Sequence, residues 1–118
     1  MPTKALDASV RHQPSAAIVY LRGEIDAFAE DVLNAAYADA ESGDPEVILL
    51  NFSAVDYINS TGIALIVSLM ARARKAHRRL LACGLSEHYV EIFQITRMAD
   101  FISMFRDETS ALTQMPAA

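Results

Sequence analysis

The sequence contains few of the residues that small proteins use as covalent links or as breaks in regular structure. Its 118 residues include one cysteine, no tryptophan, four glycines and four prolines. Because Cys83 is alone, an internal disulfide is excluded, and a chain of this length needs none, since it buries roughly two thirds of its unfolded surface. No linker, low-complexity tract or internal repeat is present. The sequence therefore predicts one compact domain.

Long hydrophobic runs are also missing. The longest are Val47 to Leu50 and Ile63 to Val67, whereas a membrane-spanning helix needs about 20 consecutive apolar residues. The first ten residues, MPTKALDASV, lack the apolar core and the cleavage pattern of a signal peptide. We therefore expect a cytoplasmic protein with no membrane insertion.

Basic residues are fewer than acidic residues. The chain has 10 Lys and Arg against 15 Asp and Glu, for a net charge of −5, which disfavours direct binding of nucleic acid. The charges are unevenly placed: residues 24–46 carry eight acids and no base, and residues 72–79 carry five of the ten bases. We interpret the basic cluster as the end of a helix, where cations complement the helix dipole. A nucleic-acid or anionic-membrane surface is the alternative.

Motifs of catalytic and cofactor sites are absent from the sequence. It contains no G-x-S-x-G elbow, no G-x-x-x-x-G-K-[ST] loop and no G-x-G-x-x-G fingerprint. His12, His77 and His88 show no metal-ligand spacing with Cys83. We expect a protein that is not an enzyme and that has no metal ion or cofactor.

Segments typical of strands and of helices alternate along the chain. Strands are expected at residues 5–11, 16–22, 46–52, 80–83 and 101–105. Helices are expected from Asp26 to the stop at Gly43 and Pro45, at about 61–77, from a Ser86 cap through Gln94, and from an Asp107 cap through Gln114. This order predicts an α/β fold with a mostly parallel central sheet of about four to five strands and helical crossovers.

Apolar residues at helical spacing predict which helix faces are buried. In the first helix they are Phe28, Val32, Ala36, Tyr37 and Ala40. In the helix at 61–77 one stripe suits the sheet: Ile63, Ile66, Val67 and Met70. Leu65 and Leu69 lie on a second face, which is either a partner surface or is buried under a neighbouring helix.

The segment from Asp56 to Gly62 holds the polar residues of most interest. It follows a strand of the predicted sheet and precedes a helix, the position where functional groups gather in open α/β sheets. We expect residues 53–60 to form a loop, with Ser60 at or beside the N-cap and Gly62 allowing close backbone approach. A simple helix cap is the alternative interpretation. One of Tyr57 and Ile58 should anchor the loop in the core, and the sequence does not say which.

The stretch VDYINSTGIALIVSLMARARKAHRRLLACGLSEHYVEIFQITRMADFISMF resembles the STAS domain of anti-sigma-factor antagonists. The segments GEIDA and EVILLNFSAVDYINSTG extend the resemblance over residues 5–114, which implies a single STAS domain in residues 1–118. The family element D-x-x-[DN]-S-[ST]-G corresponds here to Asp56, Asn59, Ser60, Thr61 and Gly62.

The resemblance implies a bacterial partner-switching protein that regulates transcription. Ser60, with Thr61 as the alternative, would accept phosphate from an anti-sigma factor that is also a serine kinase of the histidine-kinase-like ATPase fold. A PP2C-type serine phosphatase would remove it. The unphosphorylated protein, an anti-anti-sigma factor, would bind the anti-sigma factor and release a sigma factor. Asn59 stands where aspartate is common in the family, which puts recognition by a standard kinase in question.

The partner surface that we expect combines this element with the helix that follows it and with Asp26, which matches the family's aspartate after the second strand. Its residues are Asp26, Asp56, Tyr57, Ile58, Asn59, Ser60, Thr61, Gly62, Leu65 and Leu69. The alternative is a STAS scaffold or regulatory subunit of a transporter, lipid-trafficking or stress-signalling complex, which binds its partners without phosphorylation.

Overall fold

The computed structural model describes residues 4–113, which form one five-stranded sheet and four α-helices. The strands are β1 (Asp7–Gln13), β2 (Ala16–Ile25), β3 (Val47–Ile58), β4 (Arg79–Cys83) and β5 (Ser103–Phe105). The helices are α1 (Glu30–Glu41), α2 (Ser60–Lys75), α3 (Glu87–Ile95) and α4 (Glu108–Thr113), with 3-10 turns at Ala27–Ala29 and Met98–Asp100. The predicted end of the last helix at Gln114 lies outside the described residues.

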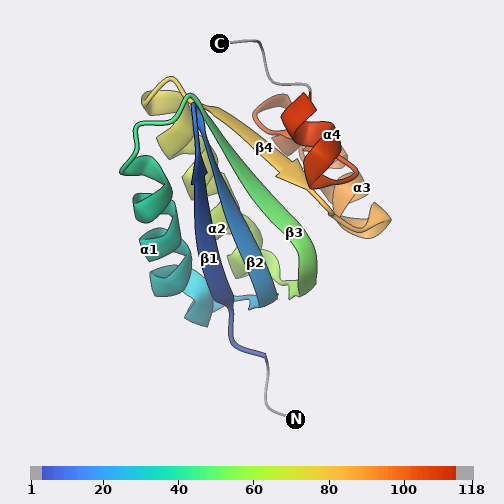
Figure 1. Cartoon of the computed structure of the whole chain (residues 1–118). Helices are drawn as coiled ribbons and strands as arrows, with labels where there is room; N and C mark the ends of the chain where they lie inside the picture. The colour runs from blue at the N-terminus through green and yellow to red at the C-terminus, as the bar shows by residue number, and fades with distance from the viewer. Residues whose placement is uncertain (1–3, 114–118) are drawn as a thin grey trace.

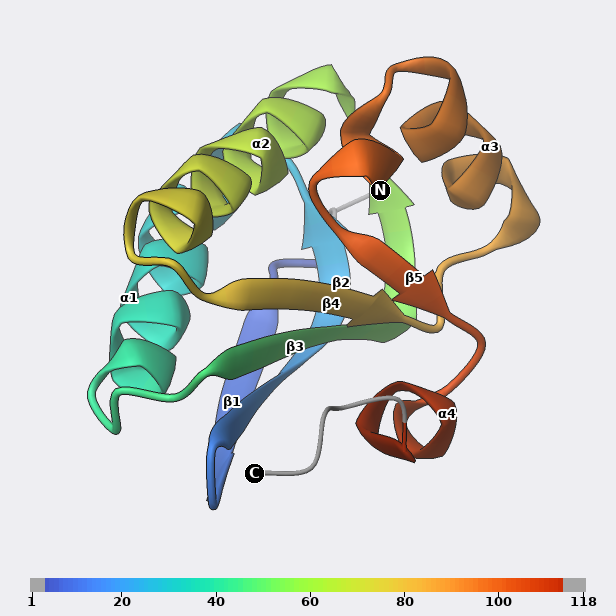
Figure 2. The same ribbon diagram turned by 90° about the horizontal axis from the view of Figure 1, so that it is seen from above.

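The strands lie in the sheet in the same order as in the sequence, β1-β2-β3-β4-β5 (Figures 1 and 2). β1 and β2 are antiparallel and are joined by a tight turn at Pro14 and Ser15. The other three pairs are parallel, and each is connected through a helix. The α/β fold with a mostly parallel sheet and helical crossovers is therefore confirmed.

The sheet separates two apolar layers of unequal size. Helices α1, α2 and α3 cover one face, and α4 lies on the other (Figure 2). Alternate residues of β3 supply both layers: Ile48 and Leu50 join the larger core, whereas Val47 and Leu49 join the smaller one with Ala111 of α4. Burial on both faces explains why this strand is a continuous apolar run.

The second half of β3 was predicted as a loop, and this prediction was wrong. Residues 53–58 continue the strand and pair with β2 as far as Ile25 opposite Ile58. Among residues 4–113, no strand pairs with them on the other side, because β4 ends at Cys83, opposite Asn51. Three of their side chains are therefore exposed: Ser53, Asp56 and Tyr57. Two register shifts in the β2–β3 pair also interrupt the alternation of apolar and polar side chains by which a strand is recognised in a sequence.

The predicted buried face of the first helix was wrong at two positions. Phe28 is 91% exposed and Val32 is also exposed. The segment begins with a 3-10 turn capped by Asp26, and this turn directs Ala29 and then Leu33 toward the sheet instead. The remaining three residues of the predicted face are buried: Ala36, Tyr37 and Ala40.

Helix α2 also differs from its predicted orientation. Its buried stripe includes Ile66, Leu69, Met70 and Ala73. Val67, predicted to face the sheet, is exposed. Leu69, predicted as a partner contact, is fully buried, because α2 packs against the sheet along the i, i+3, i+4 line that starts at Ile66. The sequence left open burial of Leu69 under a neighbouring helix, and the structure buries it where α2 packs on the sheet.

Candidate functional site: the helix start at the end of strand β3

Strand β3 passes directly into α2, and Asn59 makes the transition. Its side-chain oxygen accepts a hydrogen bond from the backbone N–H of Gly62 at 2.9 Å, and its carbonyl accepts one from Ile63 at 2.9 Å. The N–H of Asn59 donates to the carbonyl oxygen of Ile25 at 3.2 Å. Asn59 is therefore the N-cap, and Ser60 is the first helical residue, with an exposed side chain.

The start of α2 rests on the ends of two strands, and Gly62 makes this contact possible. A Cβ atom at this position would lie 2.0 Å from the carbonyl oxygen of Ile25 and 2.9 Å from a methyl carbon of Ile58. A side chain at residue 62 would push the helix away from β2 and β3. The predicted role of Gly62 in close backbone approach is confirmed.

Tyr89 of α3 fixes the last residue of β3, and sequence reasoning missed it. Its hydroxyl accepts a hydrogen bond from the N–H of Ile58 at 2.8 Å and donates one to the carbonyl oxygen of Ile58 at 3.2 Å. The hydroxyl thus supplies the partners that β4 is too short to offer. A tyrosine on the apolar face of a short helix was the available signal, since a buried hydroxyl needs a partner.

The other predicted contacts of this surface differ in accessibility. Ile58 is buried and Tyr57 is exposed, so Ile58 is the anchor into the core. Thr61 is exposed beside Ser60. Leu65 is half-buried and packs against the core. The accessible groups are therefore concentrated at the first turn of α2 and at the end of β3.

The two predicted carboxylates have different surroundings. We call residues 59–62, which form the start of α2, the Ser60 turn. Asp26 follows Ile25, whose carbonyl contacts this turn, so Asp26 lies next to it. Its carboxylate accepts a hydrogen bond from the N–H of Phe28 at 2.9 Å. Asp56 pairs instead with Lys4 at 3.4 Å. It lies in a groove of about 480 Å³ between the ends of β1, β2 and β3.

The acidic segment 24–46 is divided between the two ends of the sheet. Its first residues, including Asp26, lie at the Ser60 end. Its last residues lie at the opposite end, where Glu41 binds Arg72 at 2.7 Å and Asp44 binds Arg78 at 3.0 Å. Arg72 therefore ties α2 to the end of α1. The predicted placement of the basic cluster at a helix end is confirmed for Arg72, Arg74 and Lys75. It was wrong for Arg78 and Arg79, because α2 ends at Lys75 and Arg79 begins β4.

A comparison with known proteins identifies the family. The sequence profile of the STAS domain matches residues 7–111. The chain belongs to the STAS domain family. This STAS domain is 30% identical over 99 residues to the anti-sigma-F factor antagonist RsfA of Mycobacterium tuberculosis, over 70% of this chain and 76% of RsfA.

Solved structures share the fold of this STAS domain. An anti-sigma factor antagonist from Mycobacterium paratuberculosis has a TM-score of 0.78 at 17% identity, with 92% of each chain covered. The Bacillus cell fate determinant SpoIIAA in its phosphorylated form has a TM-score of 0.70 at 19% identity, over 92% of this chain and 98% of SpoIIAA. At these identities the comparison establishes the fold.

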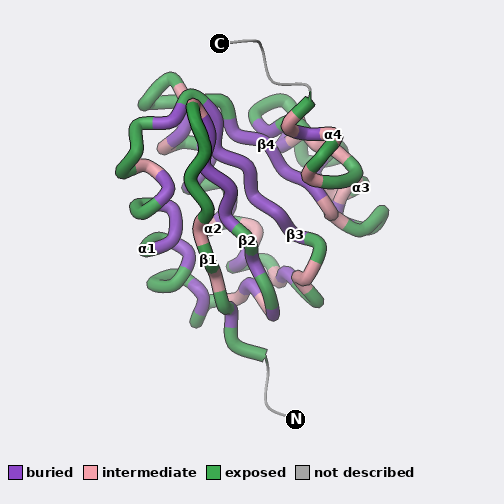
Figure 3. The backbone as a smooth tube through the Cα atoms, in the orientation of Figure 1, coloured by how far each residue is buried: buried purple, intermediate pink, exposed green. Residues whose placement is uncertain are grey.

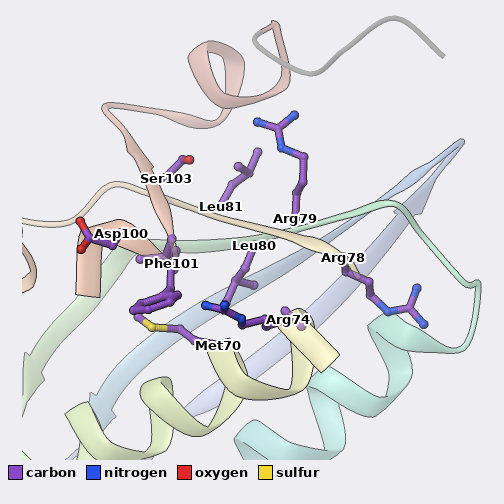
Figure 4. A pocket seen from close by; sticks show the side chains of 11 residues that line it. Met70, Arg74, Arg78, Arg79, Leu80, Leu81, Asp100, Phe101 and Ser103 are labelled. Atoms are coloured by element: carbon purple, nitrogen blue, oxygen red, sulfur yellow. The ribbon is translucent and has the colours of Figure 1, made fainter. Parts of the chain in front are cut away.

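A cavity of about 250 Å³ lies at the other end of α2 in this STAS domain (Figure 4). Arg74 points toward Phe101 there, with its guanidinium carbon 5.2 Å from the ring centre, while Arg78 points toward α1. From Ser60 to Arg74 the helix rises about 21 Å. This cavity is therefore separate from the Ser60 turn.

Two buried side chains of the STAS domain have perturbed acidity. Burial, followed by the nearby Glu41 carboxylate, raises the pKa of Tyr37 to about 12. Burial, followed by the Glu108 carboxylate, raises the pKa of Cys83 to about 11. Within residues 4–113, no three His, Cys, Asp or Glu side chains are grouped so that they could hold a metal ion. In the same range no helix is both long and apolar enough to cross a membrane.

Proposed function

We propose that this STAS domain is an anti-sigma-factor antagonist that binds an anti-sigma factor through the Ser60 turn and the start of α2. The observation that carries the proposal is the exposed Ser60 hydroxyl on a fixed turn, held by the Asn59 cap, the Gly62 contact and the Tyr89 hydrogen bonds. The similar protein RsfA is named an anti-sigma-F factor antagonist, which supports an anti-sigma factor as the partner.

Phosphorylation of Ser60 is the switch in this proposal. A phosphoserine carries a charge of about −1.5 to −2 at neutral pH. At the first residue of a 16-residue helix this charge meets the positive end of the dipole, so the fold should tolerate it. The similarity to SpoIIAA in its phosphorylated form supports this compatibility of the fold with a phosphate.

The phosphate would act on binding rather than on folding. Exposed Tyr57 and Thr61 flank Ser60, and Asp26 lies beside the turn, so a partner that covers this surface must desolvate a new dianion next to a carboxylate. A coupling of roughly 1 to 3 kcal/mol, the usual allosteric range, would lower partner affinity by about five- to 150-fold. The partner released would be a serine kinase of the histidine-kinase-like ATPase fold, and a PP2C-type phosphatase would reverse the step.

Affinity capture from the source cell tests the proposal. We expect wild type and Ser60→Ala to recover an ATPase-fold kinase and Ser60→Glu to recover at least five-fold less. Ser68→Glu is the matched control, because Ser68 is exposed two turns further along α2 and its substitution should leave recovery unchanged. Equal recovery with wild type and both Ser60 variants would contradict the proposal.

Phosphosite mass spectrometry identifies the acceptor. The recovered kinase, supplied with ATP, should modify wild type at Ser60, and Ser60→Ala should abolish the modification while Thr61→Ala preserves it. Recovery of a transport ATPase, with no phosphate on either hydroxyl, would instead support the scaffold function.

A further inference from the structure

Strand β1 forms one open edge of the sheet. Among the described residues it pairs with β2 alone, and its residues are exposed or half-buried (Figure 3). Gln13 and Ala16 flank the two-residue turn at Pro14-Ser15, so they form a hydrogen-bonded pair. Because such pairs alternate along an antiparallel ladder, the odd-numbered residues of β1 direct their N–H and C=O groups toward β2. The N–H and C=O groups of Ala8 and Val10 therefore point outward. A strand edge of this kind is a template for another strand.

We propose that β1 pairs antiparallel with β1 of a second copy, about a two-fold axis at Ser9. Ala8 then lies opposite the partner's Val10, so the outward backbone groups of both strands meet. Asp7 lies opposite the partner's Arg11 in a non-hydrogen-bonded pair, where side chains are closest. A shift by two residues in either direction loses both ion pairs. In this register the charges of β1 complement those of a second β1. We therefore assign the open edge to a second copy of this chain rather than to a foreign peptide.

The existing ion pairs fit this arrangement. Within one chain, Asp7 binds Arg22 of β2 at 2.7 Å, and Arg11 binds Glu108 of α4. In the dimer, the charges across the interface follow the order Arg22, Asp7, the partner's Arg11 and the partner's Glu108. Their signs alternate, so no like charges are adjacent in this row.

Helix α1 supplies an apolar surface along the same edge. Val32 is 37% exposed. Asp39 lies seven residues, or two turns, after Val32 and therefore on the same side of α1. Asp39 approaches His12 of β1 at 3.3 Å, so this side faces the open edge. Because α1 packs over β1 and β2 (Figure 1), joining two β1 strands about 4.8 Å apart brings the two α1 helices to roughly 10 Å. The dimer therefore covers Val32 and forms a continuous ten-stranded sheet.

Charge reversal tests the register. Sedimentation equilibrium should give wild type a mass of about 26 kDa, twice the 12.9 kDa of the chain. Asp7→Arg and Arg11→Asp should each weaken self-association more than tenfold, because like charges then lie opposite one another. An equimolar mixture of the two variants should form a heterodimer, since every charge of one variant then faces an opposite charge on the other. Circular dichroism checks that each variant is folded.

Two apolar variants test the helix contact. Val32→Ser should weaken the dimer, whereas Val67→Ser, which removes a valine of similar exposure from α2, should not. A wild type that stays monomeric at millimolar concentration overturns the proposal. A dimer that both charge reversals leave intact also overturns it.

A disulfide at the axis provides a second, independent measurement. Paired Ser9 residues would have Cα atoms about 4.5 Å apart, within the range that a disulfide accepts. Ser9→Cys should therefore form covalent dimers on mild oxidation, with the native Cys83 protected by burial. Ser68→Cys, exposed on α2, is the matched control for random collisions. Equal rates of cross-linking for the two variants would count against the dimer.

Discussion

Gly62 is the residue of the Ser60 turn that leaves least room for substitution. A methyl group there would lie 2.0 Å from the carbonyl oxygen of Ile25, well inside van der Waals contact. We expect Gly62→Ala to lower the free energy of unfolding by about 3 kcal/mol, because the helix start must move off the strands. Urea denaturation measures the loss. Gly43→Ala is the control, since its nearest neighbour is His12 at 3.4 Å, and an equal loss in both variants would contradict the steric argument.

Tyr89 holds Ile58 by two hydrogen bonds from one hydroxyl. Tyr89→Phe would leave a buried N–H and a carbonyl without partners at a cost of about 1 to 3 kcal/mol. We expect lower stability together with faster hydrogen exchange at the Ile58 amide. Tyr57→Phe, which changes an exposed hydroxyl, should alter neither quantity. Unchanged exchange in Tyr89→Phe would show that the hydroxyl does not protect this amide.

The local chemistry of the site could be predicted, and its long-range contacts could not. The place of Ser60 at or beside the N-cap follows from rules that act within one turn of a helix, so it was accessible from spacing alone. The glycine at residue 62 indicated a close approach, but not that its neighbour is the carbonyl of Ile25. Tyr89 lies 31 residues from Ile58 in the sequence, and nothing local indicates that their atoms meet. Leu69 was assigned to a partner because an almost wholly apolar helix does not reveal which of its faces meets the sheet.

At the scale of elements, the N-cap residue Asn59 stabilises the start of α2. Asn59→Ala removes the acceptor for the Gly62 N–H and should cost about 1 kcal/mol. Asn59→Asp keeps an acceptor oxygen and adds a negative charge at the positive end of the helix dipole, so its stability should be within about 0.5 kcal/mol of wild type or higher. Thermal or urea unfolding compares the three proteins. A loss in Asn59→Asp as large as that in Asn59→Ala would contradict the cap assignment.

The two main errors in predicting the elements have different causes. Residues 53–58 pair with a strand on one side only, so their polar side chains resemble those of a loop although β2 holds them extended. The α1 region begins with a 3-10 turn capped by Asp26, and the predicted face fails only near this turn, at Phe28 and Val32. In the first case the neighbouring strand determined the outcome, and in the second case the local Asp26 cap did.

At the scale of the whole molecule, Tyr37 and Cys83 make stability depend on alkaline pH. In the folded protein their pKa values are about 12 and about 11, against 10.0 and 9.0 for the unperturbed groups. Both groups keep their protons in the fold, so their contribution is complete below pH 9 and is lost as the pH rises toward 12. Each contributes about 3 kcal/mol to this loss.

Urea unfolding between pH 8 and about 12 measures this dependence. Tyr37→Phe should reduce the slope above pH 10, whereas Tyr20→Phe, at a partly exposed tyrosine, should not. A slope that is the same in both variants would show that burial of Tyr37 does not govern the alkaline transition.

The order of strands in the sheet has a consequence for how the chain folds as it is made. Sheet order repeats chain order, so each new strand that leaves the ribosome finds its neighbour already synthesised, and no strand waits for a distant segment. The Ser60 turn is the exception. Its last support, Tyr89, emerges 31 residues after Ile58. A nascent chain therefore exposes Ser60 before the turn is fixed, and the finished surface exists only once α3 has packed.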